Sequence, residues 1–187
     1  MKYYKKLIGE RIYLSPVSIE DAEKYVEWFS DFKTADGIGK SSSVMTVESE
    51  RAWIEKNLNN NEYNFAIVNK ENDELMGNCG IMNINQKDRC AEVGIFIGNE
   101  ESRSKGYGAE VLRILLDYGF NYLNLNNIYL GVMSFNERAI NCYKKVGFKE
   151  CGRRRESYFL NGKYYDHVYM DILAREFEGD YIKNQNI

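Results

Sequence analysis

The sequence predicts a mixed α/β domain of the α+β kind, with one mostly antiparallel sheet of about six or seven strands flanked by about four helices. Three observations predict this class. Short apolar runs separated by turn residues follow one another from Tyr63 to Gly98. A glycine turn then opens a long helical pattern near Gly106, and two strand-like runs meet at Asn161 and Gly162. The sheet is therefore expected to be neither purely parallel nor purely antiparallel.

Length and composition are those of one globular domain. The chain has 187 residues, 44% of them hydrophobic and 28% charged. We find no internal repeat and no proline-rich linker, so a single domain is expected over residues 1–187. Its core is expected over about residues 9–175, with a polar tail over about residues 178–187.

Charge and hydropathy disfavour several classes of partner. The net charge of -3 and the pI near 5.4 disfavour a nucleic-acid binder, which needs a basic face. No window approaches the ~20 apolar residues that span a bilayer, and the apolar N-terminal stretch is too short for a signal peptide. The expected location is cytoplasmic, with no membrane partner. The four cysteines and the single His167 lack the paired spacing of a metal site or disulfide framework, so His167 is expected to be structural.

In the N-terminal third, the residue pattern predicts one strand and two helices. Arg11 to Val17 alternates apolar and polar residues, and Ser18 offers an N-cap for a helix that runs through Phe29. A glycine- and serine-rich loop follows from Asp36 to Ser43, and it is a candidate substrate-side element. The range from Glu48 to Leu58 is predicted to be the second helix.

The remainder alternates between strand and helix patterns. Turn residues between apolar runs predict an antiparallel meander, and the last two strands are predicted to form a hairpin. The predicted strands are Tyr63 to Val68, Glu74 to Asn85, Arg89 to Gly98, Asn127 to Met133, Phe148 to Leu160 and Lys163 to Leu173. The predicted helices are Gly106 to Leu123 and Glu137 to Val146, the latter closed by Gly147.

The segment from Arg103 to Gly108 carries the most informative chemistry. It joins a strand to a helix through Gly106 and Gly108, and a helix start exposes unpaired N–H groups that can hold a pyrophosphate. Arg103 and Lys105 would add positive charge there. A Walker loop would need Gly-Lys-Ser/Thr, and a dinucleotide fingerprint would need a third glycine at Val111, so both are disfavoured. An ordinary strand-to-helix turn remains the alternative for this segment alone.

Two ordered motifs together resemble the GCN5-related N-acetyltransferase (GNAT) superfamily. The first is the acyl-CoA signature Arg/Gln-x-x-Gly-x-Gly/Ala, found here from Arg103 to Gly108, and the second runs from Asn136 to Phe148. The resemblance covers roughly Arg11 to Leu173. It is similar above all to the branch with ribosomal-protein N-terminal and spermidine acetyltransferases, which the closing segment Leu160 to His167 also fits.

The resemblance implies a sheet whose central strands splay apart and hold the pantetheine arm of acetyl-CoA in the gap. Backbone groups of Phe96, Ile97 and Gly98 would pair with the arm like an added strand. One N–H would also face the thioester oxygen and stabilise its developing charge. The pyrophosphate would lie against Arg103 and the amides of Ser104, Lys105, Gly106, Tyr107, Gly108 and Ala109.

Asn136 and Tyr143 lie seven residues apart on the second motif and therefore on one helix face. By resemblance, Asn136 bonds the pantetheine arm and Tyr143 is the general acid that protonates the departing thiolate. The alternative is structural: Asn136 caps the helix, and Tyr143 joins Ala139, Ile140 and Val146 on its buried stripe.

A base is also required, because an alkylamine with a pKa near ~10 is mostly protonated at neutral pH. Glu92 is the candidate, since it occupies the slot of the catalytic glutamate in histone-type members. Strand alternation places it with Gly94 and Phe96, opposite Val93. One type of ribosomal acetyltransferase instead uses a glutamate where this chain has Gly131. Direct action of Glu92, action through water and a purely structural ion pair all stay open.

The resulting hypothesis is direct transfer of an acetyl group from acetyl-CoA to a primary amine of a protein N-terminus, a polyamine or another small molecule, with no metal. The rival is a non-catalytic acyl-CoA sensor or interaction module. The sequence leaves the amine open, although acidic residues near the variable loop would attract a cation or simply be solvated. These acidic residues are Asp31, Asp36, Glu48 and Glu50. A homodimer is compatible with the resemblance.

Overall fold

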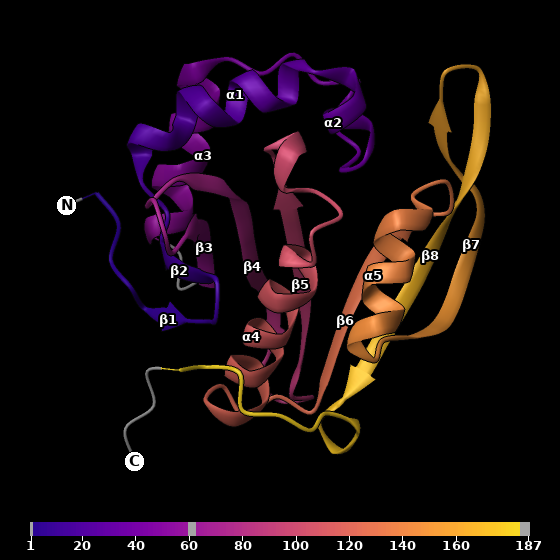
Figure 1. Cartoon of the computed structure of the whole chain (residues 1–187). Coiled ribbons are helices and arrows are strands. Elements are labelled where there is room, and N and C mark those ends of the chain that lie inside the picture. Colours follow the sequence, from indigo (N-terminus) through magenta and orange to yellow (C-terminus); the bar gives the residue numbers. More distant parts are fainter. Residues whose placement is uncertain (1, 60–62, 184–187) are drawn as a thin grey trace.

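The computed structural model describes residues 2–59 and 63–183, so the predicted tail over 178–187 is described only as far as residue 183. Its eight strands form one sheet in the order β1-β2-β3-β4-β5-β6-β8-β7 (Figure 1). All neighbours pair antiparallel except β5 and β6, which confirms the predicted mixed sheet. The strands are β1 (Leu7–Ile8), β2 (Ile12–Pro16), β3 (Tyr63–Asn69), β4 (Leu75–Asn85), β5 (Cys90–Ile97), β6 (Asn127–Met133), β7 (Lys149–Leu160) and β8 (Lys163–Leu173).

The helices begin and end close to the residues that the sequence predicted. Ser18 accepts a hydrogen bond from the Glu20 amide and opens a short 3-10 turn, Ile19–Asp21, which continues into the first helix. Gly147 closes the last helix with φ 113°, as predicted for a left-handed C-cap. The helices are α1 (Ala22–Ser30), α2 (Phe32–Asp36), α3 (Val47–Asn59), α4 (Tyr107–Asn121) and α5 (Glu137–Val146).

Two short elements were missed, which raises the strand number to eight and adds α2. Leu7 pairs with Leu14, so the N-terminal segment adds a two-residue edge strand beside β2. The five residues of α2 begin at the N-cap Asp31, whose carboxylate accepts from the Thr34 amide at 3.0 Å. Elements of two and five residues are too short to show a hydrophobic period, which is why the sequence did not reveal them.

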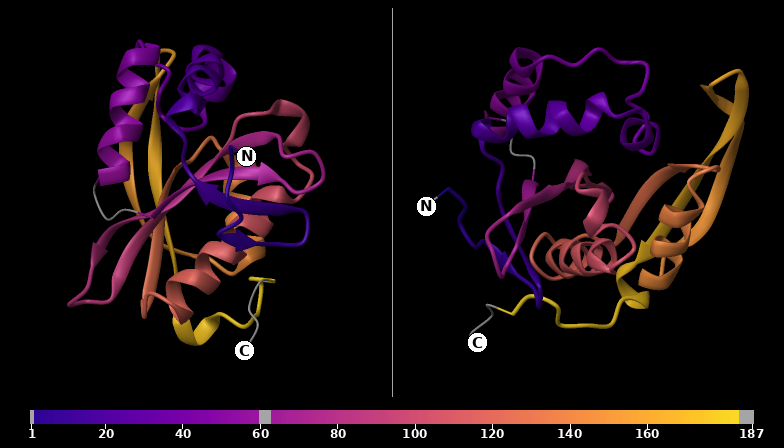
Figure 2. Two further views of the ribbon diagram at one scale, coloured as in Figure 1. Left: turned by 90° about the vertical axis from the view of Figure 1, so that its left-hand side faces the viewer. Right: turned by 45° about the horizontal axis from the view of Figure 1, so that its top comes forward.

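Helices cover both faces of the sheet (Figures 1 and 2). On one face, Val111, Leu112 and Leu115 of α4 pack against β-strand residues such as Val93 in the main core. On the other face, α1 and α3 form a smaller core with Phe96 of β5. The predicted alternation along β5 is therefore confirmed, since Val93 and Phe96 belong to cores on opposite faces.

The sheet opens between β5 and β6. These parallel strands pair only at Cys90 with Asn127, Ala91 with Ile128 and Glu92 with Tyr129. Beyond that point β5 continues beside β4, whereas β6 continues beside β8, so the two strands diverge (Figure 1). The splayed centre that the resemblance implied is confirmed, and it divides the sheet into the halves β1–β5 and β6–β8.

Across the two described ranges of the chain, none of the helices has both the length and the apolar character needed to cross a bilayer.

Candidate active site

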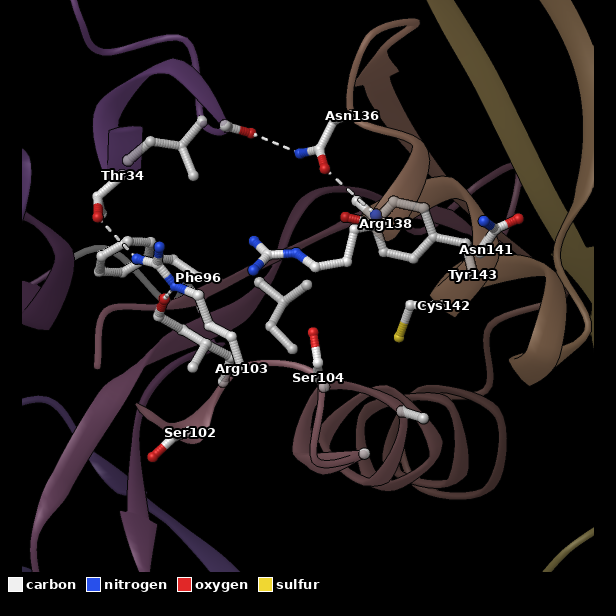
Figure 3. Close-up of a pocket in the computed structure, with 18 of the residues that line it drawn as sticks. Thr34, Phe96, Ser102, Arg103, Ser104, Asn136, Arg138, Asn141, Cys142 and Tyr143 are labelled. Carbon is white, nitrogen blue, oxygen red and sulfur yellow. Dashed lines mark hydrogen bonds between the residues drawn. The ribbon is translucent and has the colours of Figure 1, made fainter. Parts of the chain in front are cut away.

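A cavity of about 380 Å³ lies at the splay, between β5, the start of α4 and the start of α5 (Figure 3). It brings together residues that are far apart in the sequence. Thr34 of α2, together with Gly37 and Ile38 of the loop that follows α2, also lines it. The predicted site residues that line it are Phe96, Ile97, Arg103, Ser104, Gly106, Gly108, Ala109, Asn136 and Tyr143.

Gly106 forms the N-cap of α4 in a left-handed conformation, with φ 86°. The first helical bond runs from the Glu110 amide to the Gly106 carbonyl, so the amides before Glu110 have no acceptor one turn earlier in the helix. A methyl group on Gly108 would lie 3.5 Å from Cys142 Sγ on α5, which keeps the two helices close. Free amides and the positive end of the helix dipole make this wall of the cavity suited to an anion.

Arg11 braces the glycine turn from outside the cavity. Its Nε donates to Glu110 Oε2 at 2.9 Å, its Nη1 donates to the Lys105 carbonyl at 3.0 Å, and its guanidinium lies 4.4 Å from the centre of the Tyr107 ring. Lys105 and Tyr107, both predicted to bind the cofactor, therefore do not line the cavity through their side chains. Their part in binding remains a prediction that concerns their backbone amides.

Arg103 uses its guanidinium within the protein. Its Nε donates to the Ile97 carbonyl at 3.0 Å, and its Nη2 donates to the Gly98 carbonyl at 3.0 Å and to Thr34 Oγ1 at 2.7 Å (Figure 3). The side chain thus ties the end of β5 to α2. Burial, followed by repulsion from Arg138, lowers the pKa of Arg103. Its first role in this structure is to position the backbone around the cavity.

Arg138 is one of the cavity-lining residues that sequence reasoning missed. It lies in the first turn of α5 and extends into the cavity towards Phe96 (Figure 3). Within residues 2–59 and 63–183 its guanidinium forms no salt bridge, although it is close enough to Arg103 to affect that group. A cation without an acidic partner, facing free amides, favours an anionic ligand. Its position two residues after Asn136 was the available signal.

The end of β5 presents only part of its backbone to the gap. The Gly98 amide donates to the Met76 carbonyl of the β4 side at 2.9 Å. Because amide directions alternate along an antiparallel strand, Phe96 also faces β4, whereas Ile97 faces the gap. Gly98 leaves space for Trp28, since a Cβ there would lie 2.0 Å from Trp28 Cδ2. Among Phe96, Ile97 and Gly98, the backbone of Ile97 is the one placed to pair with a bound arm.

Asn136 connects the two sides of the cavity. Its Oδ1 accepts from the Ala139 amide at 3.2 Å, and this is the N-cap bond of α5. Its Nδ2 donates to the Gly37 carbonyl at 3.1 Å (Figure 3). The structural alternative for Asn136 is therefore present, while the side chain still lines the cavity. The loop after α2 is attached to the first turn of α5.

Tyr143 lines the cavity from α5 and packs edge-on against Phe148, with ring centres 6.1 Å apart. Burial raises the pKa of Tyr143 to about 12. The hydroxyl is therefore protonated at neutral pH, as a general acid must be. The structural alternative is present, because the ring packs at the edge of the core, and the side chain also lines the cavity. Its role as general acid remains a prediction.

Cys142, next to Tyr143, has the properties of a packing residue. Burial raises the pKa of its thiol, which keeps it from being a nucleophilic thiolate at neutral pH. The four cysteines are all free thiols. In the part of the chain that the structure describes, no three His, Cys, Asp or Glu side chains are grouped so that they could hold a metal ion.

Glu92 lies outside the cavity lining, on the sheet face that also carries Phe96. It occupies the last paired position before β5 and β6 diverge, opposite Tyr129. Its Oε2 accepts from Asn83 Nδ2 at 2.8 Å, so the carboxylate is held by a neighbouring strand. Its role as base remains a prediction. Its position favours an electrostatic effect on a positive charge at the point where β5 and β6 diverge.

Known proteins similar to this chain agree in chemistry. A family model described as an acetyltransferase (GNAT) domain matches residues 11–149. The uncharacterized N-acetyltransferase p20 of Bacillus licheniformis is 30% identical over 177 residues, which cover 92% of this chain and 98% of that protein. Spermidine N(1)-acetyltransferase of Vibrio cholerae is 34% identical over 122 residues, 65% of this chain and 70% of that protein.

A solved structure shares nearly the whole fold. Spermidine N-acetyltransferase from Vibrio cholerae, in complex with CoA and spermine, matches with a TM-score of 0.81 at 27% identity. The match covers 89% of this chain and 97% of the other. It therefore extends beyond the segment 11–149 to the hairpin of β7 and β8.

Proposed function

The chain belongs to the acetyltransferase (GNAT) family, and we propose that this acyl-CoA-dependent N-acetyltransferase moves the acetyl group of its co-substrate acetyl-CoA to a primary amine of a polyamine. The observation that carries the proposal is the single cavity that contains both the free amides beyond Gly106 and the side chain of Tyr143. The cavity therefore offers an anion site for the diphosphate of acetyl-CoA and a proton donor for its thioester sulfur.

The residues of the cavity suit the chemical groups of acetyl-CoA. Its diphosphate would lie against the amides that follow Gly106. Arg138, which forms no salt bridge within the described residues, would supply positive charge beside it. The amide of Ile97 would pair with the arm at the open edge of β5, whereas its carbonyl already accepts from Arg103 Nε. Apolar Ile95 and Phe96 would exclude water around the thioester.

We propose direct transfer for the chemical step. The neutral amine attacks the thioester carbon while a backbone N–H at the gap stabilises the carbonyl oxygen. Tyr143 then gives its proton to the departing sulfur. Protonation avoids the release of a charged thiolate in a largely apolar cavity, and the proton that the attacking nitrogen loses restores the Tyr143 hydroxyl. No covalent enzyme intermediate is required, consistent with the raised pKa of Cys142.

Two acidic residues near the loop from Asp36 to Ser43, which we call the acceptor loop, support a cationic substrate. Asp36 ends α2 at the start of the loop, and its Oδ1 is buried without a hydrogen-bond partner in the described part of the chain. Glu50 on α3 is only 3% exposed, and burial raises its pKa. The buried Oδ1 of Asp36 is costly without a partner, and a bound ammonium would remove that cost, whereas Glu50 already has Lys40 nearby. The relatives named for spermidine act on a substrate of this charge.

The test is Tyr143→Phe, assayed by thioester consumption with spermidine, a peptide N-terminus and an aminoglycoside. We expect turnover to fall by roughly 100-fold or more, because general acid catalysis contributes ~10²–10⁴, while CoA affinity stays the same. Tyr122→Phe, at a side chain that is 50% exposed, is the matched control. Unchanged turnover would remove Tyr143 from the mechanism. CoA binding by the wild type without turnover on any amine would support the acyl-CoA sensor instead.

A further inference from the structure

His167, the only histidine of the chain, lies against a glycine on the neighbouring strand. It belongs to β8 and pairs with Met133 of β6. A Cβ placed on Gly131 would lie 2.3 Å from His167 Nε2 and 3.0 Å from its Cε1. The imidazole ring therefore occupies the space above β6 where any other residue at position 131 would put its side chain.

This space lies on the sheet face away from α4 and α5. Along β6, Ile128, Leu130 and Val132 are buried in the main core with α4, so Gly131 faces the other side. Glu92 is on that same face, at the last pair before the strands diverge. His167 does not itself line the cavity, but it lies on the sheet face opposite Tyr143 and α5, from which an amine would reach a thioester held in the gap.

The surroundings of His167 leave its ring nitrogens available. The ring stacks on Tyr169 with centres 4.9 Å apart, and neither nitrogen makes a hydrogen bond to any residue that the structure describes. The charged groups that act on it are Arg154 of β7 and Glu92 of β5. On its own strand the titratable residues of the same face are Tyr165 and Tyr169, and on β6 the titratable residue is Tyr129. Burial and Arg154 lower the pKa of His167, and Glu92 raises it.

We infer that His167 accepts the proton that the substrate ammonium must lose before it attacks, and that Glu92 stabilises the imidazolium that forms. The inference rests on the proposed acetyl transfer. One ammonium proton passes to a ring nitrogen, and the freed lone pair forms the C–N bond. As the C–S bond breaks, Tyr143 protonates sulfur, and the second nitrogen proton restores Tyr143. The imidazolium then releases its proton to water, so the turnover yields amide, CoA thiol and one proton.

The decisive experiment compares the pH dependence of kcat/KM for spermidine between the wild type and His167→Gln. With a histidine base, kcat/KM is flat between the pKa of His167 and that of the amine, near ~10. Without it, only the free amine reacts, so kcat/KM rises about tenfold per pH unit up to pH ~10. We expect a loss of roughly 100-fold at pH 7, within the usual range for a general base.

Two further measurements do not depend on how His167→Gln folds. The single histidine gives one imidazole signal in a proton NMR titration, and its pKa must equal that of the acid limb of the wild-type profile. In Arg154→Gln, at an exposed side chain, that limb must move to higher pH because a positive neighbour is lost. Glu92→Gln must move it to lower pH.

The outcomes separate this inference from the proposed function. A wild type that acetylates spermidine while His167→Gln keeps the flat profile would overturn the role of His167 and leave the acetyltransferase intact. An acid limb that differs from the NMR pKa would overturn it as well. If the wild type consumes no thioester with any amine, both assignments fail.

Discussion

At the gap between β5 and β6, the two faces of the sheet are built in different ways. On the α4 side, the ligand-facing groups are backbone amides set by Gly106 and held in place by Arg11. On the sheet face away from α4, the groups that could act on an amine are side chains, such as His167 and Glu92, from separate strands. A site made of backbone depends on local conformation, whereas a site made of side chains depends on register between distant segments. The first is therefore written in a short motif and the second is not.

The largest effect is expected from Gly106→Val, which tests whether backbone amides form the anion site. The residue has φ 86°, a conformation that a β-branched residue adopts only with strain, and a Cβ there would lie 3.4 Å from Arg11 Nη2, so the turn that sets the amides would be distorted. Losing two charge-assisted hydrogen bonds costs about 3 kcal/mol, so acetyl-CoA should bind roughly 100-fold more weakly. Isothermal titration calorimetry with acetyl-CoA measures this directly.

Gly162→Val is the matched control for that experiment. Gly162 turns the β7–β8 hairpin with φ 77°, and a Cβ there meets nothing within 4 Å. Both variants bear a similar backbone strain, of the order of 1–2 kcal/mol, but only Gly106 lies at the cavity. Normal acetyl-CoA binding by Gly106→Val would reject the anion site, and equal weakening in both variants would assign the effect to strain.

A smaller effect is expected from Arg138→Gln, which asks how much a side chain adds to the backbone site. One charge-assisted contact to a phosphate contributes about 1.5–3 kcal/mol, so acetyl-CoA affinity should fall at least about tenfold. The difference from the wild type should shrink at high salt, because screening weakens the contribution of the charge. Arg155→Gln, at an exposed residue of β7, removes the same charge elsewhere and should leave binding unchanged. Equal affinity in Arg138→Gln would place the phosphates away from this residue.

The smallest effect is expected from Asn136→Ala, which disconnects the loop after α2 from the start of α5. The variant loses the N-cap bond to Ala139 and the bond to the Gly37 carbonyl. Loss of an N-cap costs about 1 kcal/mol, which thermal unfolding would detect as a lower Tm. We also expect KM for spermidine to rise a few-fold, because the acceptor loop is released, with little change for acetyl-CoA. Lys144→Ala, at an exposed residue of the same helix that does not line the cavity, is the control for helix stability. A selective loss of acetyl-CoA affinity would show that Asn136 acts on the cofactor instead.

The sequence predicted most of the fold because long elements repeat their signal over several turns or strand residues. The patterns for Asn127–Met133 and Glu137–Val146 gave both ends correctly. Leu7–Ile8 was missed because two residues carry no period, and α2 because its cap residue Asp31 is followed by only five helical residues. The opening between β5 and β6 came from the family resemblance, since pairing between distant strands leaves no local signal.

For the site, the sequence identified backbone positions better than side-chain roles. Gly106, Gly108 and Tyr143 lie around one cavity, as predicted. Arg103 was assigned to phosphates, but its guanidinium is bound to Ile97, Gly98 and Thr34, and a contact across 69 residues cannot be deduced from spacing. The place of His167 above Gly131 depends on the register of β6 with β8, which only the folded sheet defines.

The three residue pairs that join β5 to β6 have a consequence for motion. Two half-sheets that share so few ladder bonds are held together mainly by α4, α5 and the main core. The Ile97 amide faces the opening and has no strand partner among the residues that the structure describes, so it should exchange its hydrogen with solvent quickly. The Gly98 amide, bonded to Met76, should exchange slowly. A ligand arm that pairs with Ile97 would act as a temporary ninth strand. Binding of acetyl-CoA should therefore make the whole sheet more rigid, and its release should make the sheet more mobile.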